Sequence, residues 1–353
     1  MAERPSKQSS SFPKHGSMCL PLAEVLSYNL EIEEGDGFIG DQASKSALLD
    51  IIQGLRDLLP ENADPLGDDP MEEFGKDRLD TLLTEGDFAA AGLLHAAIEE
   101  FSGRLEKIIR RFLRLKAWRE TERIVIGGGV RQSRMGQIAI GRTATLLRKG
   151  GIDIRPVRHH PDEAGLIGAV HLAPSWIFAG HDSILALDIG GSNIRAGVVR
   201  LDIGKHPDLT GVEVWQSELW SHSDEDPKRD EAVDRTAEML QRLLRKADKE
   251  GLHLAPFIGV GCPGVIGEDG SIDRGAQNLP GNWESKGFNL PDELRDRVPR
   301  IGDHETLVLV HNDAVVQGLS EAPFCRDVGH WAALTIGTGL GNASYATRDA
   351  EDE

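Results

Sequence analysis

The sequence is poor in cysteine and in aromatic residues. It has 3 cysteines among 353 residues, and Phe, Trp and Tyr together make up 5%. Cys19, Cys262 and Cys325 lie far apart and form neither a CxxC pair nor a disulfide ladder, a pattern typical of a reducing compartment. We therefore expect a cytoplasmic protein, and no zinc, because no cysteine cluster is present to hold that metal.

Basic residues and long apolar runs are also scarce. The chain has 39 Lys and Arg against 58 Asp and Glu, and a formal net charge of −19 at pH 7. This charge repels nucleic acids and anionic membranes, so the expected partners are small molecules, with a homodimer left open. No apolar run approaches the roughly 18 residues that span a bilayer. Residues 1–16 lack a secretory apolar core and are predicted to form a mobile tail.

Two common nucleotide-binding motifs are missing. The Rossmann pattern GxGxxG fails at both candidate sites, where Gln132 and Asn342 replace the third glycine, and no GK[ST] of a Walker A loop occurs. A hydrophobic content of 39% is enough for a substantial core. From residue 183 onward, strand and helix patterns alternate, which favours a mixed α/β sheet.

Four segments before residue 183 have readable patterns. Residues 60–77 are rich in Pro, Gly and acidic residues, which predicts a solvated loop. Asp87 is expected to cap a long amphipathic helix that continues to Phe112. Residues 123–130 have the pattern of a buried strand entering a glycine turn, and residues 159–173 that of a capped helix.

Residues 184–199 and 331–347 share one pattern, in which a Gly-rich turn connects two apolar strands. Turn residues without Cβ atoms let consecutive N–H groups point at one spot, which suits phosphate oxygens, although each turn alone also fits an ordinary hairpin. Asp188, just before the first turn, could hold Mg²⁺ directly or through water. The predicted phosphate contacts are Gly190, Gly191, Ser192, Asn193, Gly337, Thr338 and Gly339.

Two polar segments are candidates for the acceptor side of such a site. Asp313 follows an apolar strand, where it could accept a proton from a substrate hydroxyl or, alternatively, cap a helix. Residues 276–283 (AQNLPGNW) offer amides to sugar hydroxyls and an indole face to sugar C–H groups. A surface turn with Trp283 folded into the core would explain the same segment equally well.

Together these motifs resemble the ROK family (repressors, open reading frames and kinases) of the actin-like ATPase superfamily. DIGGSNIRAG and TIGTGLG resemble its two phosphate loops, GCPGVI with NLPGNW its sugar-side segment, and HNDA its catalytic Asn-Asp pair. Residues 78–173 resemble the family's C-terminal third, but here that third comes first. The resemblance implies an α/β protein with the actin-like ATPase fold, in which two ribonuclease-H-like lobes flank a cleft, written in circularly permuted order.

The resemblance also implies a division of the chain. The larger lobe would comprise residues 17–160 and 312–353, and the smaller lobe residues 161–311. Within the smaller lobe we expect a helix at 161–173, a connector at 174–182 and a sheet from 183. Circular permutation further predicts that residues near 1–20 and 340–353 lie on the same lobe.

The implied activity is that of an ATP- and Mg²⁺-dependent hexose kinase. Gly128 and Gly129 would approach the adenosine, and Asp313 would act as the base. Residues 1–77 match the family poorly, the family's zinc motif is absent, and His15 and Asp41 are merely positional candidates for its missing sugar ligands. A non-catalytic sugar-responsive regulator and an actin-like kinase for another acceptor are the alternatives. The implied sugar-binding residues are Asn278, Gly281, Asn312 and Asp313.

Overall fold

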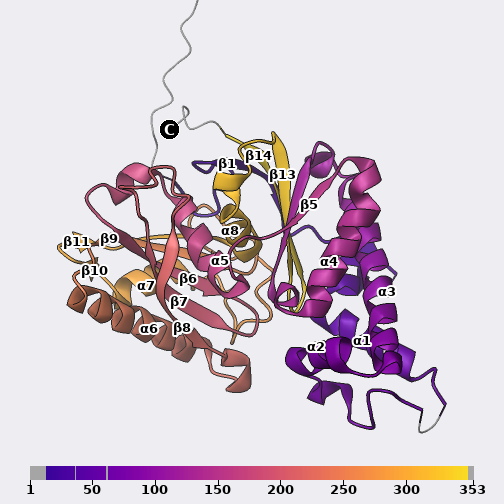
Figure 1. Ribbon diagram of the computed structural model, residues 1–353. Helices are drawn as coiled ribbons and strands as arrows, with labels where there is room; N and C mark the ends of the chain where they lie inside the picture. Colours follow the sequence, from indigo (N-terminus) through magenta and orange to yellow (C-terminus); the bar gives the residue numbers. More distant parts are fainter. Residues whose placement is uncertain (1–12, 36, 61–62, 349–353) are drawn as a thin grey trace, which may run out of the picture.

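The computed structural model describes residues 13–35, 37–60 and 63–348, which form two five-stranded mixed sheets (Figure 1). The first sheet has the strand order β1-β14-β13-β4-β5 and the second the order β12-β9-β6-β7-β8. The strands of the first sheet are β1 Ala23–Tyr28, β4 Arg123–Gly127, β5 Asp153–Pro156, β13 His330–Ile336 and β14 Leu340–Thr347. Those of the second are β6 Ser183–Ile189, β7 Ile194–Arg200, β8 Glu213–Trp220, β9 Leu254–Cys262 and β12 Leu307–Asn312. Two short hairpins, β2 Glu33–Glu34 with β3 Gly37–Phe38 and β10 Arg300–Ile301 with β11 His304–Glu305, lie outside these sheets.

The two sheets share one internal plan. Each has a central antiparallel hairpin, β6–β7 or β13–β14, with a third antiparallel strand beside it, β8 or β1. On the other side each adds two parallel strands, β9 and β12 or β4 and β5. In the second sheet these positions follow chain order, whereas in the first sheet the hairpin is the last part of the chain.

Three apolar clusters hold the sheets and helices in layers. One cluster packs four helices on the outer face of the first sheet, and another packs two helices on the outer face of the second. The third lies between the sheets, around two short helices and the 3₁₀ turns that follow α5 (Figure 1). The outer helices are α1 Lys45–Arg56, α2 Lys76–Glu85, α3 Phe88–Phe112 and α4 Arg134–Leu147 on one side and α6 Arg229–Lys249 and α7 Leu290–Arg297 on the other. Between the sheets lie α5 Pro161–Gly168, η6 Ala169–Leu172, η7 Ser175–Phe178 and α8 Asp313–Leu319.

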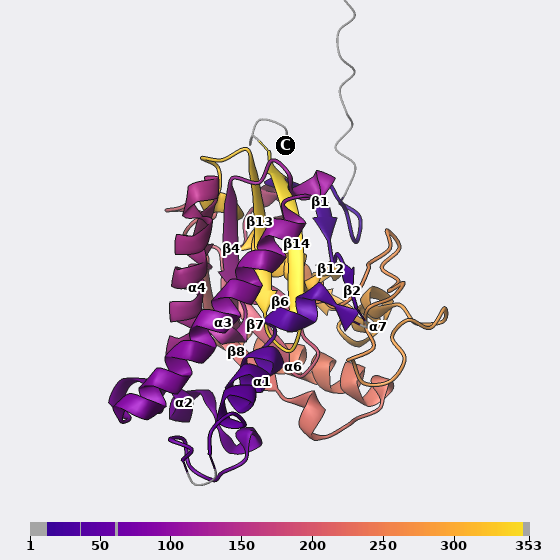
Figure 2. The ribbon, with the colours of Figure 1, turned by 90° about the vertical axis from the view of Figure 1, so that its right-hand side faces the viewer.

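The long helix α3 forms as its sequence predicts. The Asp87 carboxylate accepts hydrogen bonds from the backbone N–H groups of Ala89 and Ala90, at 2.9 and 2.8 Å, and so caps the helix. Its apolar side chains are buried against the first sheet, which the helix crosses in Figure 2. None of the described helices is long and apolar enough to cross a membrane.

The prediction of a solvated loop over residues 60–77 is wrong in part, because Leu66, Met71 and Phe74 are buried in the apolar cluster that also contains residues of α1 and α2. The Arg78 guanidinium lies 4.0 Å from the centre of the Phe74 ring, a cation–π contact that acidic composition does not reveal.

The prediction of a mobile tail over residues 1–16 is wrong for His15 and Gly16. Residues 1–12 lie outside the described part, but the Gly16 N–H donates to the Val310 carbonyl of β12 at 3.0 Å. The Val310 N–H in turn donates to His15 Nδ1 at 3.3 Å. These residues therefore continue the structure along the edge of the second sheet.

The described ends of the chain lie together. Ala23 of β1 pairs with Thr347 of β14, and the Arg348 guanidinium donates to the Leu20 carbonyl at 2.9 Å. For Leu20 and Arg348 the two ends therefore lie together beside the first sheet, as expected, whereas His15 and Gly16 contact β12 of the second sheet.

Candidate functional site

Two acidic side chains lie at the carboxyl ends of parallel strands in the second sheet. Asp188 is near the end of β6, and Asp313 directly follows β12; both strands pair with β9. Burial raises the pKa of Asp188 to about 6. Burial, together with the negative charge of Asp188, raises the pKa of Asp313 to about 7. The carboxyl ends of the strands thus bring together two carboxyl groups that resist ionising at the same time.

The N-cap of α8 is Asn312, so the alternative role considered for Asp313 does not apply. Asn312 Oδ1 accepts the N–H groups of Ala314 and Val315 at 3.0 and 3.3 Å. Its Nδ2 donates to the Gly264 carbonyl at 3.0 Å. The buried amide of Asn312 therefore fixes the start of α8 and leaves the partly exposed Asp313 carboxyl out of the cap.

Asp188 is 4% exposed and closely surrounded. Its Oδ2 atom lies 4.0 Å from a guanidinium nitrogen of Arg195, which also forms an ion pair with Asp162 at the start of α5. The Gln317 side chain of α8 is a further hydrogen-bond partner, which favours the ionised carboxylate. A Cβ atom on Gly165 would lie 2.4 Å from the Asp188 carboxyl carbon, so a glycine is required where α5 passes this group.

The first Gly-rich turn is fixed by a hydrogen bond within the turn and by contacts with Ser221 and His222, which follow β8. The Gly190 N–H donates to the Asn193 carbonyl at 2.8 Å, and the Gly190 carbonyl lies 2.9 Å from His222 Nε2. Ser221 donates to Asn193 Oδ1 at 2.8 Å. These contacts fix the turn and point the Ser192 hydroxyl toward the second turn.

The second Gly-rich turn lies opposite the first. Thr338 Oγ1 is 3.5 Å from Ser192 Oγ, so the two predicted phosphate turns approach each other. The Gly337 carbonyl accepts the Lys45 N–H at 2.9 Å, and the Gly337 N–H donates to the Gly339 carbonyl at the same distance.

The glycine turn after β4 packs against the end of β13, the strand that leads into the second Gly-rich turn. Gly128 has φ of +85°, and a Cβ atom there would lie 2.4 Å from the Ile336 carbonyl oxygen. Gly129 begins the 3₁₀ turn η4 Gly129–Gln132 and has open space at its Cβ position. The close backbone approach explains why Gly128 is required next to the turn that contains Gly337.

The amide segment at 276–283 is only partly at this site. Asn278 is exposed and lies beside the first turn, because a Cβ atom on Gly191 would be 3.1 Å from the Asn278 Cβ. Gly281 has φ of +73° and packs against Arg229 at the start of α6. Trp283 is 1% exposed, and its indole N–H donates to the Pro280 carbonyl at 2.7 Å. The indole is therefore a core group, and the idea that its face packs on a sugar is wrong.

The two positional candidates near the N-terminus have local partners. His15 accepts the Val310 N–H, two residues before the Asn312 and Asp313 pair. Asp41 accepts the Phe38 N–H at 3.0 Å.

Sequence reasoning missed several residues that surround the predicted site. Except for the pairing of Arg195 with Asp188, their contacts come from distant parts of the chain, which no local pattern signals. One signal was available in the sequence: Arg195 lies directly opposite Asp188 in the β6–β7 hairpin, as any tight-turn register predicts. The missed residues are Asp162, Gly165, Arg195, His222, Gln317 and Lys45.

Comparison with known proteins adds a family likeness over part of the chain. No protein-family model matches it. A glucokinase of Thermotoga maritima is 32% identical over 160 residues, which are 45% of this chain and 43% of that protein. The ROK family glucokinase from Streptomyces griseus, solved in complex with glucose and AMPPNP, is 23% identical; the match covers 47% of this chain and 46% of that one, with a TM-score of 0.35. The ROK hexokinase from Thermus thermophilus is 25% identical over 45% of each chain, with a TM-score of 0.28.

Two sheets of equal strand order on a shared helical layer give this chain the actin-like ATPase fold. Within that class, the chain is similar to ROK-family sugar kinases, as its motifs indicated. It spans less than half the length of the Thermotoga glucokinase that it matches.

Proposed function

We propose that this chain is an ATP-dependent hexose kinase that transfers the γ-phosphoryl group to a sugar hydroxyl. The observation that carries the proposal is the pair of carboxyl groups, Asp188 and Asp313, at the carboxyl ends of the two parallel strands that flank β9, beside two Gly-rich turns. Asp313 has the properties of a general base, since a raised pKa of about 7 matches proton transfer near neutral pH. A glucokinase that is 32% identical over 160 residues supports the same activity.

The remaining predicted residues take roles around this pair. Gly190, Gly191, Ser192 and Asn193 would contact the phosphates from the second sheet, and Gly337, Thr338 and Gly339 from the first. Because Ser192 and Thr338 already approach to 3.5 Å, the turns must separate to admit a triphosphate. Gly128 and Gly129 would lie toward the adenosine, and Asn278 toward the sugar. Asn312 would orient Asp313 through its cap, and Gly281 would shape the segment that contains Asn278.

The residues present also fit a magnesium ion. Burial raises the pKa of Asp188, and burial together with the charge of Asp188 raises the pKa of Asp313, so a divalent cation would relieve the repulsion at Asp313. When bound with ATP, Mg²⁺ would neutralise charge on the phosphates. Asp188 would hold the ion directly or through water. Arg195 and Gln317 would fix the position of that carboxylate.

We also propose that the chain is a circular permutation of the usual order, with lobes formed by residues 17–160 with 312–353 and by residues 161–311. The strand order supports this. Reading β13, β14, β1, β4 and β5 in that sequence reproduces the plan of the second sheet, but in the chain β13 and β14 come last. Two sheets with the same strand plan are most simply explained if the chain was opened at the connection between β14 and β1.

The direct test is a coupled assay of ADP release across hexoses, N-acetylhexosamines and non-sugar acceptors. We expect ADP release that requires Mg²⁺ and is stimulated by at least one hexose. The Asp313→Asn variant is the matched control, and it should bind nucleotide without this stimulation. Sugar binding with no stimulated ADP release would favour a regulator, and stimulation only by non-sugar acceptors would favour the other kinase alternative.

A further inference from the structure

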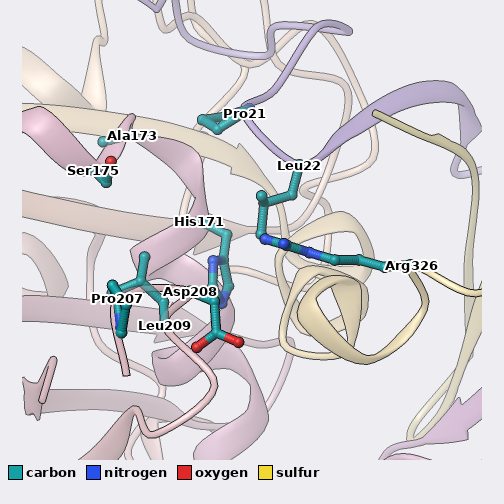
Figure 3. A pocket seen from close by; sticks show the side chains of 9 residues that line it. All are labelled: Pro21, Leu22, His171, Ala173, Ser175, Pro207, Asp208, Leu209 and Arg326. Carbon is teal, nitrogen blue, oxygen red and sulfur yellow. The ribbon is translucent and has the colours of Figure 1, made fainter. Parts of the chain in front are cut away.

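A cavity lies apart from the Asp188 and Asp313 carboxyl groups, at the other end of the helical segment formed by α5 and η6. It is a cavity of about 250 Å³ between η6, the N-terminal approach to β1 and the loop after β7 (Figure 3). α5 carries Asp162 and Gly165 beside Asp188, whereas η6 carries His171 into this cavity. The two locations are therefore distinct. The residues that line the cavity are Pro21, Leu22, His171, Ala173, Ser175, Pro207, Asp208, Leu209 and Arg326.

The imidazole of His171 has no hydrogen-bond partner among the residues that the structure describes. The residue is 2% exposed, and neither ring nitrogen is bonded to another described group. Burial, together with the nearby charges of His159 and Arg326, lowers the pKa of His171 to about 3, so the ring is neutral. A neutral imidazole has one donor and one acceptor, and leaving both unpaired in the interior is costly. A partner from outside the chain would remove that cost.

Two opposite charges lie at the rim of the same cavity. Arg326 is exposed and, among the described residues, has neither an ion pair nor a hydrogen bond. Asp208 accepts hydrogen bonds from Thr210 through Oδ1, which leaves Oδ2 without a partner in the described part of the chain. In Figure 3 the Arg326 side chain extends toward His171, and the Asp208 carboxylate lies on another side of the ring in this view. Hydrogen bonds from Thr210 lower the pKa of Asp208, and the charge of Arg326 lowers it further, which places the two charges within electrostatic range of each other without an ion pair.

We propose that this cavity binds a small zwitterion of the α-amino acid class. The ligand carboxylate would pair with Arg326 and its ammonium group with Asp208, while His171 supplies a hydrogen bond at the base. Pro21, Leu22 and Leu209 would pack against an aliphatic side chain. A simple anion would leave Asp208 unpaired and facing a like charge, and a neutral sugar would leave both rim charges without a counterion.

The test uses the full chain and the standard L-amino acids as probes, in a thermal-shift screen followed by calorimetry. At least one aliphatic amino acid should raise the melting temperature and bind with a measurable Kd. The matching α-keto acid, which lacks the ammonium group, and the matching amine, which lacks the carboxylate, should each bind at least about tenfold more weakly. An absence of binding by every amino acid at millimolar concentration would overturn the proposal, as would equal binding of the keto acid.

Variants of the lining residues then distinguish binding in this cavity from adventitious binding elsewhere on the protein. Arg326→Gln and Asp208→Asn should each weaken binding by at least about tenfold, and Arg245→Gln, an exposed arginine on α6, should not change it. His171→Phe keeps a ring in the core and removes the unpaired nitrogens, so the protein should stay folded and bind more weakly. Unchanged affinity in Arg326→Gln or in a folded His171→Phe protein would contradict the assignment. Because binding is read without ADP release, the result is independent of the proposed kinase activity.

Discussion

Asp188 raises the pKa of Asp313, although the two residues are 125 positions apart in the chain, as their numbers show. The coupling follows from topology: β6 and β12 both run parallel to β9, so their carboxyl ends coincide at one edge of the sheet. The positive charge of Arg195 lowers the pKa of Asp188. Hydrogen bonds from the backbone N–H groups of Ala314 and Asp313 lower the pKa of Asp313. Neither set of contacts cancels the effect of burial.

Removing the charge at Asp188 should make Asp313 more acidic. In Asp188→Asn the repulsion is gone, so the pKa of Asp313 should fall below about 7. Isotope-edited NMR of the aspartate carboxyl carbons, recorded across the titration without nucleotide, measures this shift directly. A control variant, Asp303→Asn, removes an acidic residue from the exposed β10–β11 turn and should leave the titration unchanged. An unshifted Asp313 in the Asp188 variant would contradict the coupling.

Replacing Asp313 with asparagine should abolish turnover while ligand binding persists. The amide keeps the size of the side chain but cannot accept the hydroxyl proton, and such a base contributes about two to four orders of magnitude in rate. We expect kcat to fall by at least about a hundredfold, with little change in the affinity for sugar or ATP. Steady-state kinetics measures kcat, and calorimetry on the same preparation measures the affinities for sugar and ATP. A folded variant with near-normal kcat would rule out Asp313 as the base.

Protein stability should fall as the pH rises from about 4 to about 7. The folded-state pKa of Asp313 is about 7, above its ordinary value of 3.8, so the folded protein holds a proton in this range that the unfolded chain has lost. Unfolding is then favoured as the pH increases, and Asp188 adds to the effect up to about pH 6. Urea denaturation at about pH 4 and about pH 8, which bracket this range, should show a smaller pH dependence in Asp313→Asn than in the natural sequence. An identical pH dependence in both proteins would refute the assignment.

The sequence predicted the elements that carry local signals and missed those that depend on distant contacts. The cap at Asp87, the buried β4 and the two glycine hairpins follow from residue spacing alone. Trp283 could not be assigned from its turn, because its burial depends on Phe288 and on the second sheet. The Arg195 to Asp162 ion pair joins β7 to α5 across 33 positions, and no periodicity marks such a contact.

Gly165→Ala should disable the site without removing the fold. The added methyl group would lie 2.4 Å from the Asp188 carboxyl carbon, so either α5 or the carboxylate must move. We expect a loss of about 1–3 kcal/mol in unfolding free energy and a larger proportional loss in kcat. Gly141→Ala on α4 is the matched control, since nothing lies within 4 Å of its Cβ position, and it should be neutral or stabilising by up to about 1 kcal/mol. Equal effects of the two substitutions on kcat would mean that packing at Asp188 is unimportant.

The proposed circular permutation predicts that the chain can be reopened at a natural boundary. Arg348 is bonded to Leu20, so a short Gly-Ser linker from residue 348 to residue 17 should close the chain with little strain. The new ends belong between Ala179 and Gly180, which are both exposed, whereas Phe178 is fully buried and must stay attached to η7. This protein should unfold cooperatively and retain nucleotide affinity, because every pairing within the two five-stranded sheets is preserved, although the His15 and Gly16 contacts with Val310 at the edge of β12 are removed. A second permutant opened inside β9, between β6 and β12, breaks the sheet and should not fold. If the first permutant failed to fold as the second does, the boundary between η7 and β6 would be an integral part of the fold, and the proposed permutation would lose its support.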